Sequence, residues 1–333
     1  MKEFINSTIL ITGATGFIGG LLANELISMN TLENASIKLV LPVRDIRRAR
    51  EKYPHSDEKN SCITFIEESL ENLHSEMLDM PIDYIFHCAC VTQSSIMIAK
   101  PVEVIDGIIL GTKNILEIGR QKKIRSMVYL SSMEIYGIIR NDNRLITEHM
   151  LGELDIYSTR SCYPMGKRIA EHYCYTYYKE YGVPVKIARL AQTFGYGVDK
   201  DDNRVFAQFA KAAILGEDIV LHTEGLSMGN YCESKDVVNA LFTILEKGQA
   251  GEAYNVVNEE NTMQIRDMAK LVAEKIADGR INVVFDIPKD HSYGYAKDTQ
   301  LRLSSEKLRK LGWRPTKSLE AMYKDLITWM TRK

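Results

Sequence analysis

The sequence has 333 residues, of which 45% are hydrophobic and 26% are charged, and its formal net charge is −2. This composition is ordinary for a globular protein with one large or two modest cores, and the balanced charge argues against a nucleic-acid or membrane-surface partner. No apolar run approaches the roughly 18 residues of a membrane span, and polar residues interrupt the N-terminus where a signal segment would lie. We therefore expect a cytoplasmic protein.

Six cysteines are scattered along the chain, and no two of them form a C-x-x-C motif. Neither their spacing nor that of the histidines is typical of a metal site, so we expect no metal. Scattered single thiols are typical of a protein that stays reduced in the cytosol.

The chain begins with a pattern of strand, glycine-rich turn and helix. The apolar run at Ile9–Ile11 predicts a buried strand, and an apolar helical pattern starts at Phe17. Between and within them, Gly13, Gly16 and Gly19 follow the spacing G-x-x-G-x-x-G. Glycines allow the tight turn, the close approach of backbone to a phosphate and the close packing of helix on strand. The free N–H groups and the dipole at a helix N-terminus favour anions, so this stretch predicts a dinucleotide-pyrophosphate site.

Strand-like and helix-like segments alternate after this turn, which predicts an α/β fold with a doubly wound parallel sheet. We assign residues 1–185 to a Rossmann domain that binds NAD(P). Residues 186–333 are assigned mainly to a smaller substrate-binding domain, interleaved with the last strands of the main sheet. The further predicted strands are 37–43, 62–66, 84–90, 126–131, 185–190, 218–221 and 253–257, and the predicted helices are 102–119, 204–215, 235–247 and 263–277.

The second strand ends at Val43, where the adenosine ribose of a bound dinucleotide is expected. An acidic residue at this point accepts a hydrogen bond from a ribose 2′-hydroxyl, whereas an arginine pairs with a 2′-phosphate. Arg44 comes first and Asp45 follows it. Arg44 therefore favours NADP, and NAD remains the alternative.

Residues typical of proton removal from an alcohol follow the strand at 126–131. Ser132 comes directly after this strand, and Tyr163 and Lys167 are four residues apart on one predicted helix face. A free phenol has a pKa near ~10, and a neighbouring ammonium group lowers it. A serine hydroxyl can bind the same substrate oxygen while hydride passes to a nicotinamide.

Several segments carry a resemblance to a known family. The chain resembles the extended short-chain dehydrogenases/reductases, the family of NAD-dependent epimerases and dehydratases acting on nucleotide sugars. The stretch from Arg160 to Glu171, with Ser132 and Glu134, is most similar to the UDP-glucuronate decarboxylase branch. The segments that carry the resemblance are 11–19, 86–89, 111–117, 130–137, 163–167, 188–190 and 311–319.

The resemblance implies a role for each matching residue. Tyr163 is expected to be the base, Lys167 its activator and the anchor of the nicotinamide ribose, and Ser132 the hydroxyl partner. Glu134 lies where decarboxylases and 4,6-dehydratases carry a catalytic carboxylate. The implied cofactor-binding residues are Gly13, Thr15, Gly16, Phe17, Ile18, Gly19, Arg44, Ser69, Ala89, Tyr163 and Lys167. The implied substrate-binding residues are Thr92, Ser132, Gln192 and Arg204, and the helices at 100–120 and 160–181 imply a homodimer.

The sequence departs from the family pattern at five positions. Met133 replaces the acid with which 4,6-dehydratases protonate the leaving hydroxyl, so water elimination is disfavoured. Gly229 falls where many relatives place an arginine for the phosphates or carboxylate of the substrate. Gln192 and Ile108 replace two active-site asparagines, and Ser69 replaces an adenine-binding aspartate.

Two functions remain open at this point. In the first, the enzyme oxidises a nucleotide sugar to a keto intermediate with bound NAD(P) and then re-reduces or rearranges it, as an epimerase does. In the second, it is a net NADPH-dependent reductase of a nucleotide-linked ketose or other carbonyl compound, which Arg44 and the missing sugar-site residues favour. A non-catalytic nucleotide-sensing protein is disfavoured because Ser132, Tyr163 and Lys167 are all present.

Overall fold

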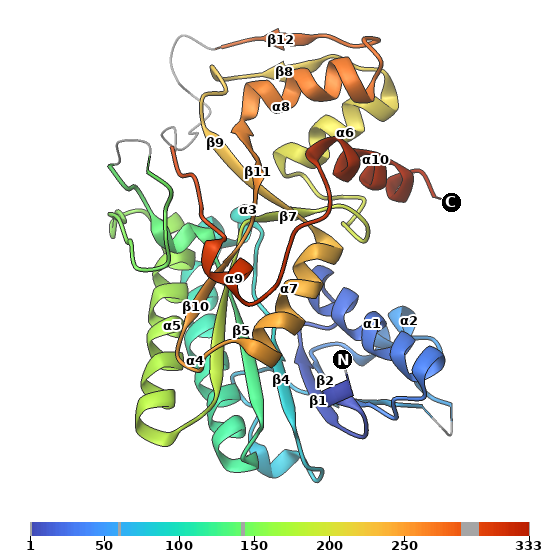
Figure 1. Cartoon of the computed structure of the whole chain (residues 1–333), viewed down its shortest axis with the longest axis vertical. Helices are drawn as coiled ribbons and strands as arrows, with labels where there is room; N and C mark the ends of the chain where they lie inside the picture. The colour runs from blue at the N-terminus through green and yellow to red at the C-terminus, as the bar shows by residue number, and fades with distance from the viewer. Residues whose placement is uncertain (1, 59–60, 141–143, 288–299, 333) are drawn as a thin grey trace. The chain divides into compact units, whose positions relative to one another are not determined.

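The computed structural model describes residues 2–58, 61–140, 144–287 and 300–332 (Figure 1). These residues form two compact units, each built from three separate segments of the chain. Among the described residues, no helix is both long and apolar enough to cross a membrane. The first unit comprises Met1–Gly137, Glu153–Arg189 and Ala240–Tyr254, and the second comprises Ile138–Gly152, Leu190–Asn239 and Asn255–Lys333.

A seven-stranded sheet, with the strand order β10-β6-β5-β4-β1-β2-β3, is the centre of the fold. The pairs from β3 to β5 are parallel, as the alternation of strands and helices predicts. The predicted α/β doubly wound fold is therefore confirmed. The strands are β1 (Thr8–Thr12), β2 (Lys38–Val43), β3 (Ile63–Glu67), β4 (Tyr84–His87), β5 (Ser126–Ser132), β6 (Val185–Leu190) and β10 (Ala253–Val256).

Continuous apolar runs explain why these strands form the core. All five residues of β1 are buried, with Ile9, Leu10 and Ile11 fully inaccessible, because a parallel sheet is covered on both faces. Burying each such side chain stabilises the fold by roughly 1.5–3 kcal/mol. In Figure 1, α4 (Pro101–Lys122) and α5 (Cys162–Tyr181) lie side by side against the sheet, and α1 (Phe17–Glu33) lies on its other side.

Short elements connect the strands and helices of the first unit. Pro101 occupies the first position of α4, where a missing backbone N–H leaves no hydrogen bond unmade. The helix α5 ends at Gly182, which takes the left-handed conformation. The short elements are η1 (Lys2–Phe4), α2 (Ile46–Lys52), η2 (Ser75–Met77), α3 (Ser94–Ala99), η3 (Met133–Tyr136) and η4 (Thr159–Ser161).

The second unit contains a three-stranded sheet, β11-β9-β7, and a two-stranded sheet, β12-β8. Phe194 of β7 stacks on Phe206 with ring centroids 4.6 Å apart, and Tyr231 and Tyr323 pack edge-on or tilted against Phe194. Its strands are β7 (Gln192–Phe194), β8 (Ile219–Leu221), β9 (Met228–Glu233), β11 (Asn258–Gln264) and β12 (Val283–Phe285); its helices are α6 (Val205–Leu215), α8 (Ile265–Leu271), the π-turn η5 (Val272–Ile276), α9 (Glu306–Lys310) and α10 (Leu319–Met330), and α7 (Ser234–Lys247) begins in it.

Two predicted boundaries are wrong. The helix expected over 263–277 begins only at Ile265, because Met263 and Gln264 pair in antiparallel register with β9. The strand expected over 84–90 ends at His87, and the chain then turns beside Gly13. In both places long-range backbone pairing or packing, rather than local hydrophobic pattern, decides where the element ends.

Candidate cofactor and catalytic site

The glycine turn after β1 has the geometry of a phosphate cradle. Gly13 has a φ of +68°, which L side chains rarely adopt, and a Cβ at this position would lie 2.8 Å from the Ala89 Cα. A Cβ at Gly19 would collide with the Gly13 carbonyl. The helix α1 begins at Phe17 after Gly16, and no side chain caps its first turn. Its N–H groups therefore remain free for an anion, which fits the pyrophosphate of a dinucleotide.

Two residues that the sequence motifs did not reveal support this turn. The Lys52 ammonium donates hydrogen bonds to the carbonyls of Thr15 and Gly16 at 3.1 and 2.8 Å, and the Tyr53 hydroxyl donates to the Ala14 carbonyl at 2.8 Å. Burial, and then the nearby Arg48 charge, lower the Lys52 pKa. In the sequence, Lys52 is only a basic residue near the end of a predicted helix, and such residues are too common to indicate a role at the turn.

A buried histidine links β1 and β4 beneath the turn. His87 Nδ1 lies 2.8 Å from the Thr12 hydroxyl, and its Nε2 lies 3.1 Å from the Thr112 hydroxyl. Burial, assisted by the Lys167 charge, lowers the pKa of His87 to about 3, so the ring is neutral near pH 7. Because the Thr12 hydroxyl also accepts from the Ala89 N–H at 3.0 Å, this network fixes the backbone against which Gly13 packs.

Arg44 and Asp45, the two candidate contacts to the ribose at the end of β2, have different environments. The Asp45 carboxylate caps α2 by accepting from the N–H groups of Arg47 and Arg48 at 2.9 and 3.3 Å, which lowers the Asp45 pKa. Arg44 is exposed and has no hydrogen-bond or ion-pair partner among the described residues. Asp45 is therefore committed to the helix, and Arg44 is the free charged group at this strand end.

The structure brings Ser132, Tyr163 and Lys167 together in the first unit. Ser132 ends β5 and its hydroxyl accepts from the Glu134 N–H at 3.2 Å. Tyr163 and Lys167 lie in the first two turns of α5, both nearly inaccessible to solvent. The Lys167 ammonium lies 5.9 Å from the centre of the Tyr163 ring and donates to the Leu130 carbonyl at 2.6 Å.

The environment of the Tyr163 phenol contains opposing influences on its pKa. Burial raises the pKa most, and the neighbouring Cys90 and Glu134 raise it further. The nearby Ser132 hydroxyl and the Arg160 charge lower it. The phenol can act as a base near neutral pH only if such favourable groups overcome the effect of burial.

Glu134 forms an ion pair that the sequence analysis did not identify. The Arg160 Nη2 lies 3.0 and 2.8 Å from the two carboxylate oxygens of Glu134, and both side chains are partly exposed. Arg160 lies in η4, three residues before Tyr163, and its guanidinium carbon lies 5.7 Å from the centre of the Tyr163 ring. The sequence signal that could have pointed to Arg160 is its place in the stretch Arg160 to Glu171 around Tyr163.

The remaining expected cofactor and substrate residues of the first unit lie in loops. Ser69 follows β3 and its N–H donates to the Glu68 carboxylate at 2.8 Å. Thr92 is exposed in the loop between β4 and α3. Ala89 lies directly against Gly13, as described above, whereas Ile108 is buried in α4 among the core residues.

The second unit holds the other expected substrate residues. Gln192 begins β7, and its side-chain oxygen is buried with no hydrogen-bond partner among the described residues. Arg204 pairs with Asp202, with 2.6 Å between Nη2 and Oδ2. A Cβ at Gly229 would collide with the Tyr231 hydroxyl, so a larger residue there requires the buried Tyr231 side chain to shift. The Tyr231 phenol therefore occupies the place where the arginine expected from the family pattern would begin its side chain.

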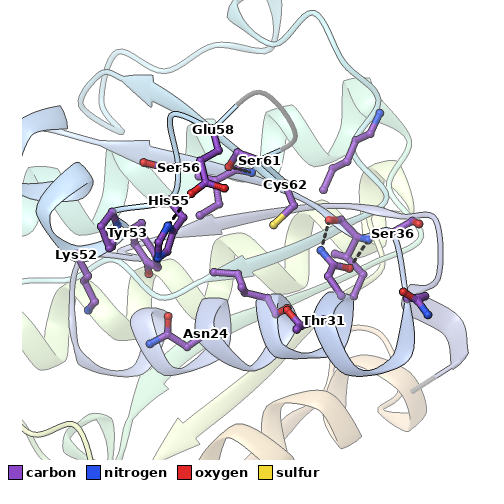
Figure 2. Close-up of a pocket in the computed structure, with 17 residues that line it drawn as sticks. Asn24, Thr31, Ser36, Lys52, Tyr53, His55, Ser56, Glu58, Ser61 and Cys62 are labelled. Carbon is purple, nitrogen blue, oxygen red and sulfur yellow. Dashed lines mark hydrogen bonds and ion pairs between the residues drawn. The ribbon is translucent and has the colours of Figure 1, made fainter.

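One pocket of the first unit is lined in part by Lys52 and Tyr53, the two residues that support the glycine turn (Figure 2). It has a volume of about 690 Å³ and is lined by α1 and by the chain around the starts of β2 and β3, including Asn24, Ser36 and Cys62. None of the expected site residues lines it. Among the described residues, no cluster of His, Cys, Asp and Glu could hold a metal ion.

Comparison with known proteins identifies the family. The model of the NAD dependent epimerase/dehydratase family matches residues 9–257, more than half of the chain. The chain therefore belongs to the NAD-dependent epimerase/dehydratase family, a family of enzymes that use a nicotinamide cofactor.

Individual relatives within this family are distant. UDP-glucuronic acid decarboxylase 6 of Arabidopsis thaliana is 28% identical over 93% of this chain and 84% of its own length. UDP-glucuronic acid decarboxylase 1 of Danio rerio is 27% identical over 100% of this chain and 75% of its own length. The structure of UDP-glucuronic acid 4-epimerase from Bacillus cereus, in complex with UDP-glucuronic acid and NAD, superposes with a TM-score of 0.77 at 23% identity, covering 97% and 98% of the two chains. This last likeness shows a shared fold.

Proposed function

We propose that this enzyme removes hydride and a proton from a hydroxyl of a nucleotide-linked sugar, forms a keto-sugar intermediate, and then rearranges or re-reduces it. The observation that carries the proposal is the assembly of Ser132, Tyr163 and Lys167 in the same unit as an uncapped glycine turn. A nicotinamide cofactor, when bound, supplies the hydride acceptor. The glycine turn with Gly13 and Gly19 would hold its pyrophosphate.

The catalytic side chains have separate tasks in this proposal. Tyr163 takes the hydroxyl proton, and Ser132 holds the same substrate oxygen while donating to or accepting from the phenol. Lys167 supplies positive charge beside the phenol and is fixed by the Leu130 carbonyl. Gln192 is suited to a substrate hydrogen bond because its buried oxygen has no partner among the described residues.

Epimerisation and decarboxylation both proceed through such an intermediate. The decarboxylase relatives and Glu134 support the second outcome, whereas the absence of an arginine at Gly229 weakens it. Dehydration is disfavoured because Met133 cannot protonate a leaving hydroxyl. Thr92 and Arg204 are further candidates for substrate contacts, although the ion pair with Asp202 occupies Arg204.

The cofactor we propose is NADP, with NAD as the alternative. Asp45 is engaged as the helix cap, while exposed Arg44 can pair with a 2′-phosphate. The same observation favours a second candidate function, net reduction of a nucleotide-linked carbonyl compound by NADPH. Mass spectrometry of the cofactor released from purified protein separates these cases. Retained NAD supports the recycling mechanism, whereas an empty protein that prefers NADPH supports the reductase.

We also propose a cytoplasmic homodimer. All six cysteines are free, which suits a reducing compartment. Exposed apolar side chains on the neighbouring helices α4 and α5 offer a surface for a second copy. These include Val102, Leu110, Ile169, Tyr175 and Tyr181. Light scattering on the eluted protein tests the dimer, and replacing Ile169 with Glu should give a monomer.

The substitution Tyr163→Phe tests the proposed chemistry most simply. It keeps the ring but removes the proton acceptor, so we expect turnover to fall by at least ~100-fold. The assay should offer NAD and NADP with UDP-glucuronic acid, UDP-glucose and a UDP-linked ketose. An unchanged rate in this variant would exclude Tyr163 as the base.

A further inference from the structure

Two cations, not one, lie beside the ring of Tyr163. The Lys167 ammonium is 5.9 Å from the ring centre, and the Arg160 guanidinium carbon is 5.7 Å from it. Lys167 is fully enclosed, whereas a third of the Arg160 side chain is exposed. The tyrosine–lysine pattern does not require this second cation, which lies at a distance from the ring similar to that of Lys167.

The charge of Arg160 is shared with a carboxylate. Its Nη2 donates to both oxygens of Glu134, at 3.0 and 2.8 Å. The other guanidinium N–H groups have no partner among the described residues, and the Glu134 side chain is 40% exposed. A partly exposed pair held through one nitrogen is weakly stabilising and can rearrange when a ligand arrives.

Within the described part of the chain, the charged neighbours of the phenol are Arg160, Glu134 and Lys167, because the other titratable groups around it are neutral. Cys90 in the loop after β4 and Tyr129 in β5 are neutral near pH 7, because burial raises the pKa of both. Burial likewise raises the pKa of Cys162 on α5, and Ser132 contributes a hydroxyl. The ionisation of the phenol therefore depends on two cations and one anion.

We propose that Arg160 is a positioning residue that helps hold Tyr163 in its ionised, proton-accepting form, and that Glu134 sets how much of the Arg160 charge the phenol experiences. A substrate group that hydrogen-bonds Glu134 leaves more of the guanidinium charge for the phenol. Binding of substrate and activation of the base are then coupled through one ion pair. The inference rests on the proposed function, in which Tyr163 is the base.

The size of the effect follows from the distance. A unit charge 5.7 Å from the ring changes the ionisation of the phenol by roughly 0.5 to 2 pH units, taking an effective dielectric constant between ~80 and ~20. Loss of the cation raises the phenol pKa, because the anion is no longer stabilised. Loss of the Glu134 charge lowers it. Activity requires the phenolate, so the rate rises with pH through this pKa.

The test measures the rate of nicotinamide reduction in single turnovers as a function of pH. UDP-glucuronic acid is the first probe, and the other nucleotide sugars named above are used if it does not react. Arg160→Met should move the rising limb to higher pH by roughly 0.5 to 2 pH units. Glu134→Gln should move the limb to lower pH, whatever it does to the plateau. Arg160→Lys should restore most of the native position, and the double variant Arg160→Met/Glu134→Gln should lie between the single variants. A merely structural Arg160 would lower the rate at every pH and leave the limb in place.

A second measurement separates failure of this inference from failure of the proposed function. If the native protein reduces no nicotinamide with any nucleotide sugar, the proposed function fails. Near-ultraviolet absorbance of the protein loaded with its preferred dinucleotide, taken as the difference from Tyr163→Phe in each background, still follows the Tyr163 phenolate directly. A higher titration midpoint in Arg160→Met supports the role of Arg160. Coincident midpoints, or no Tyr163 titration in the pH range where the native protein stays folded, would overturn it.

Discussion

Two of the arginine–glutamate pairs in the first unit have the same chemistry but lie in opposite environments. The Arg189–Glu171 pair is enclosed, with only 8% and 9% of the two side chains exposed. Arg189 reaches Glu171 through two nitrogens and also donates to the Tyr136 hydroxyl at 3.0 Å. The Arg160–Glu134 pair uses one nitrogen and is 33% and 40% exposed.

The difference indicates what each pair can do. In the enclosed pair, each charge depends on its partner because water cannot replace it, so the Glu171 charge raises the Arg189 pKa against the effect of burial. In the exposed pair, water or a substrate can replace either partner at little cost. The enclosed pair therefore fixes the end of β6 against α5, whereas the exposed pair remains free to respond beside the Tyr163 phenol.

Breaking the enclosed pair should have the largest effect on stability. Arg189→Met leaves the Glu171 carboxylate buried without its partner, and we expect the free energy of unfolding to fall by about 3–5 kcal/mol. Urea denaturation measures it. The matched control is Arg120→Met, which breaks the exposed Arg120–Glu117 pair of α4 and should leave the free energy of unfolding nearly unchanged. Equal losses in the two variants would mean that enclosure does not distinguish the pairs.

The next prediction concerns how the buried His87 makes the stability of the protein depend on pH. The folded pKa of His87 is about 3, below the ordinary value of 6.5, so the unfolded chain binds the extra proton between these values. Stability should therefore fall as the pH decreases below 6.5, by about 1.4 kcal/mol per pH unit from this group.

His87→Gln should flatten this part of the curve of unfolding free energy against pH, even if it lowers stability at pH 7. Replacing the exposed His74 with Gln is the control and should leave the slope as it is. A His87→Gln curve parallel to that of the native protein would show that the ring is not the group that titrates.

A smaller effect is expected at the glycine turn. Lys52→Met removes the two hydrogen bonds to the Thr15 and Gly16 carbonyls, each worth about 0.5–1.5 kcal/mol. We expect the affinity for the preferred dinucleotide to fall about five- to tenfold, measured by calorimetry. Arg50→Met, in the same helix but paired with exposed Asp57, should leave the affinity unchanged. A loss in both variants would point to the general charge of α2 rather than to the support of the turn.

The smallest effect on stability should come from the exposed pair. Arg160→Met should change the free energy of unfolding by less than ~1 kcal/mol in the urea experiment used for Arg189→Met. A loss comparable with that of Arg189→Met would show that Arg160 holds the fold and would weaken its assigned role at Tyr163.

Local patterns were enough to predict the central sheet and the glycine turn. The strand, turn and helix from Ile9 onwards are determined by residues close together in the sequence, namely the apolar run Ile9–Ile11 and the glycine spacing. They are present in the structure as expected. The β9–β11 pairing and the start of α8 at Ile265 were missed because antiparallel partners 27 to 36 residues apart leave no local signal.

The same limit applies to the site. The four-residue spacing of Tyr163 and Lys167 is visible in the sequence, but the contact of Arg160 with Glu134 joins two short turns from different parts of the chain. The capping role of Asp45 was likewise hidden, since the sequence alone does not say whether a carboxylate faces a ribose or its own helix. Residues that act through partners distant in sequence are the ones that pattern analysis omits.

The most direct test of the proposed function is rapid mixing of the cofactor-loaded protein with the nucleotide sugars named above, while the absorbance of reduced nicotinamide is followed. We predict that reduced nicotinamide forms with one of these sugars in the native protein and is not detected on the same timescale in Tyr163→Phe. Formation at the native rate in Tyr163→Phe, or no formation with any nucleotide sugar in a protein that binds the cofactor, would contradict a keto-sugar mechanism based on Tyr163.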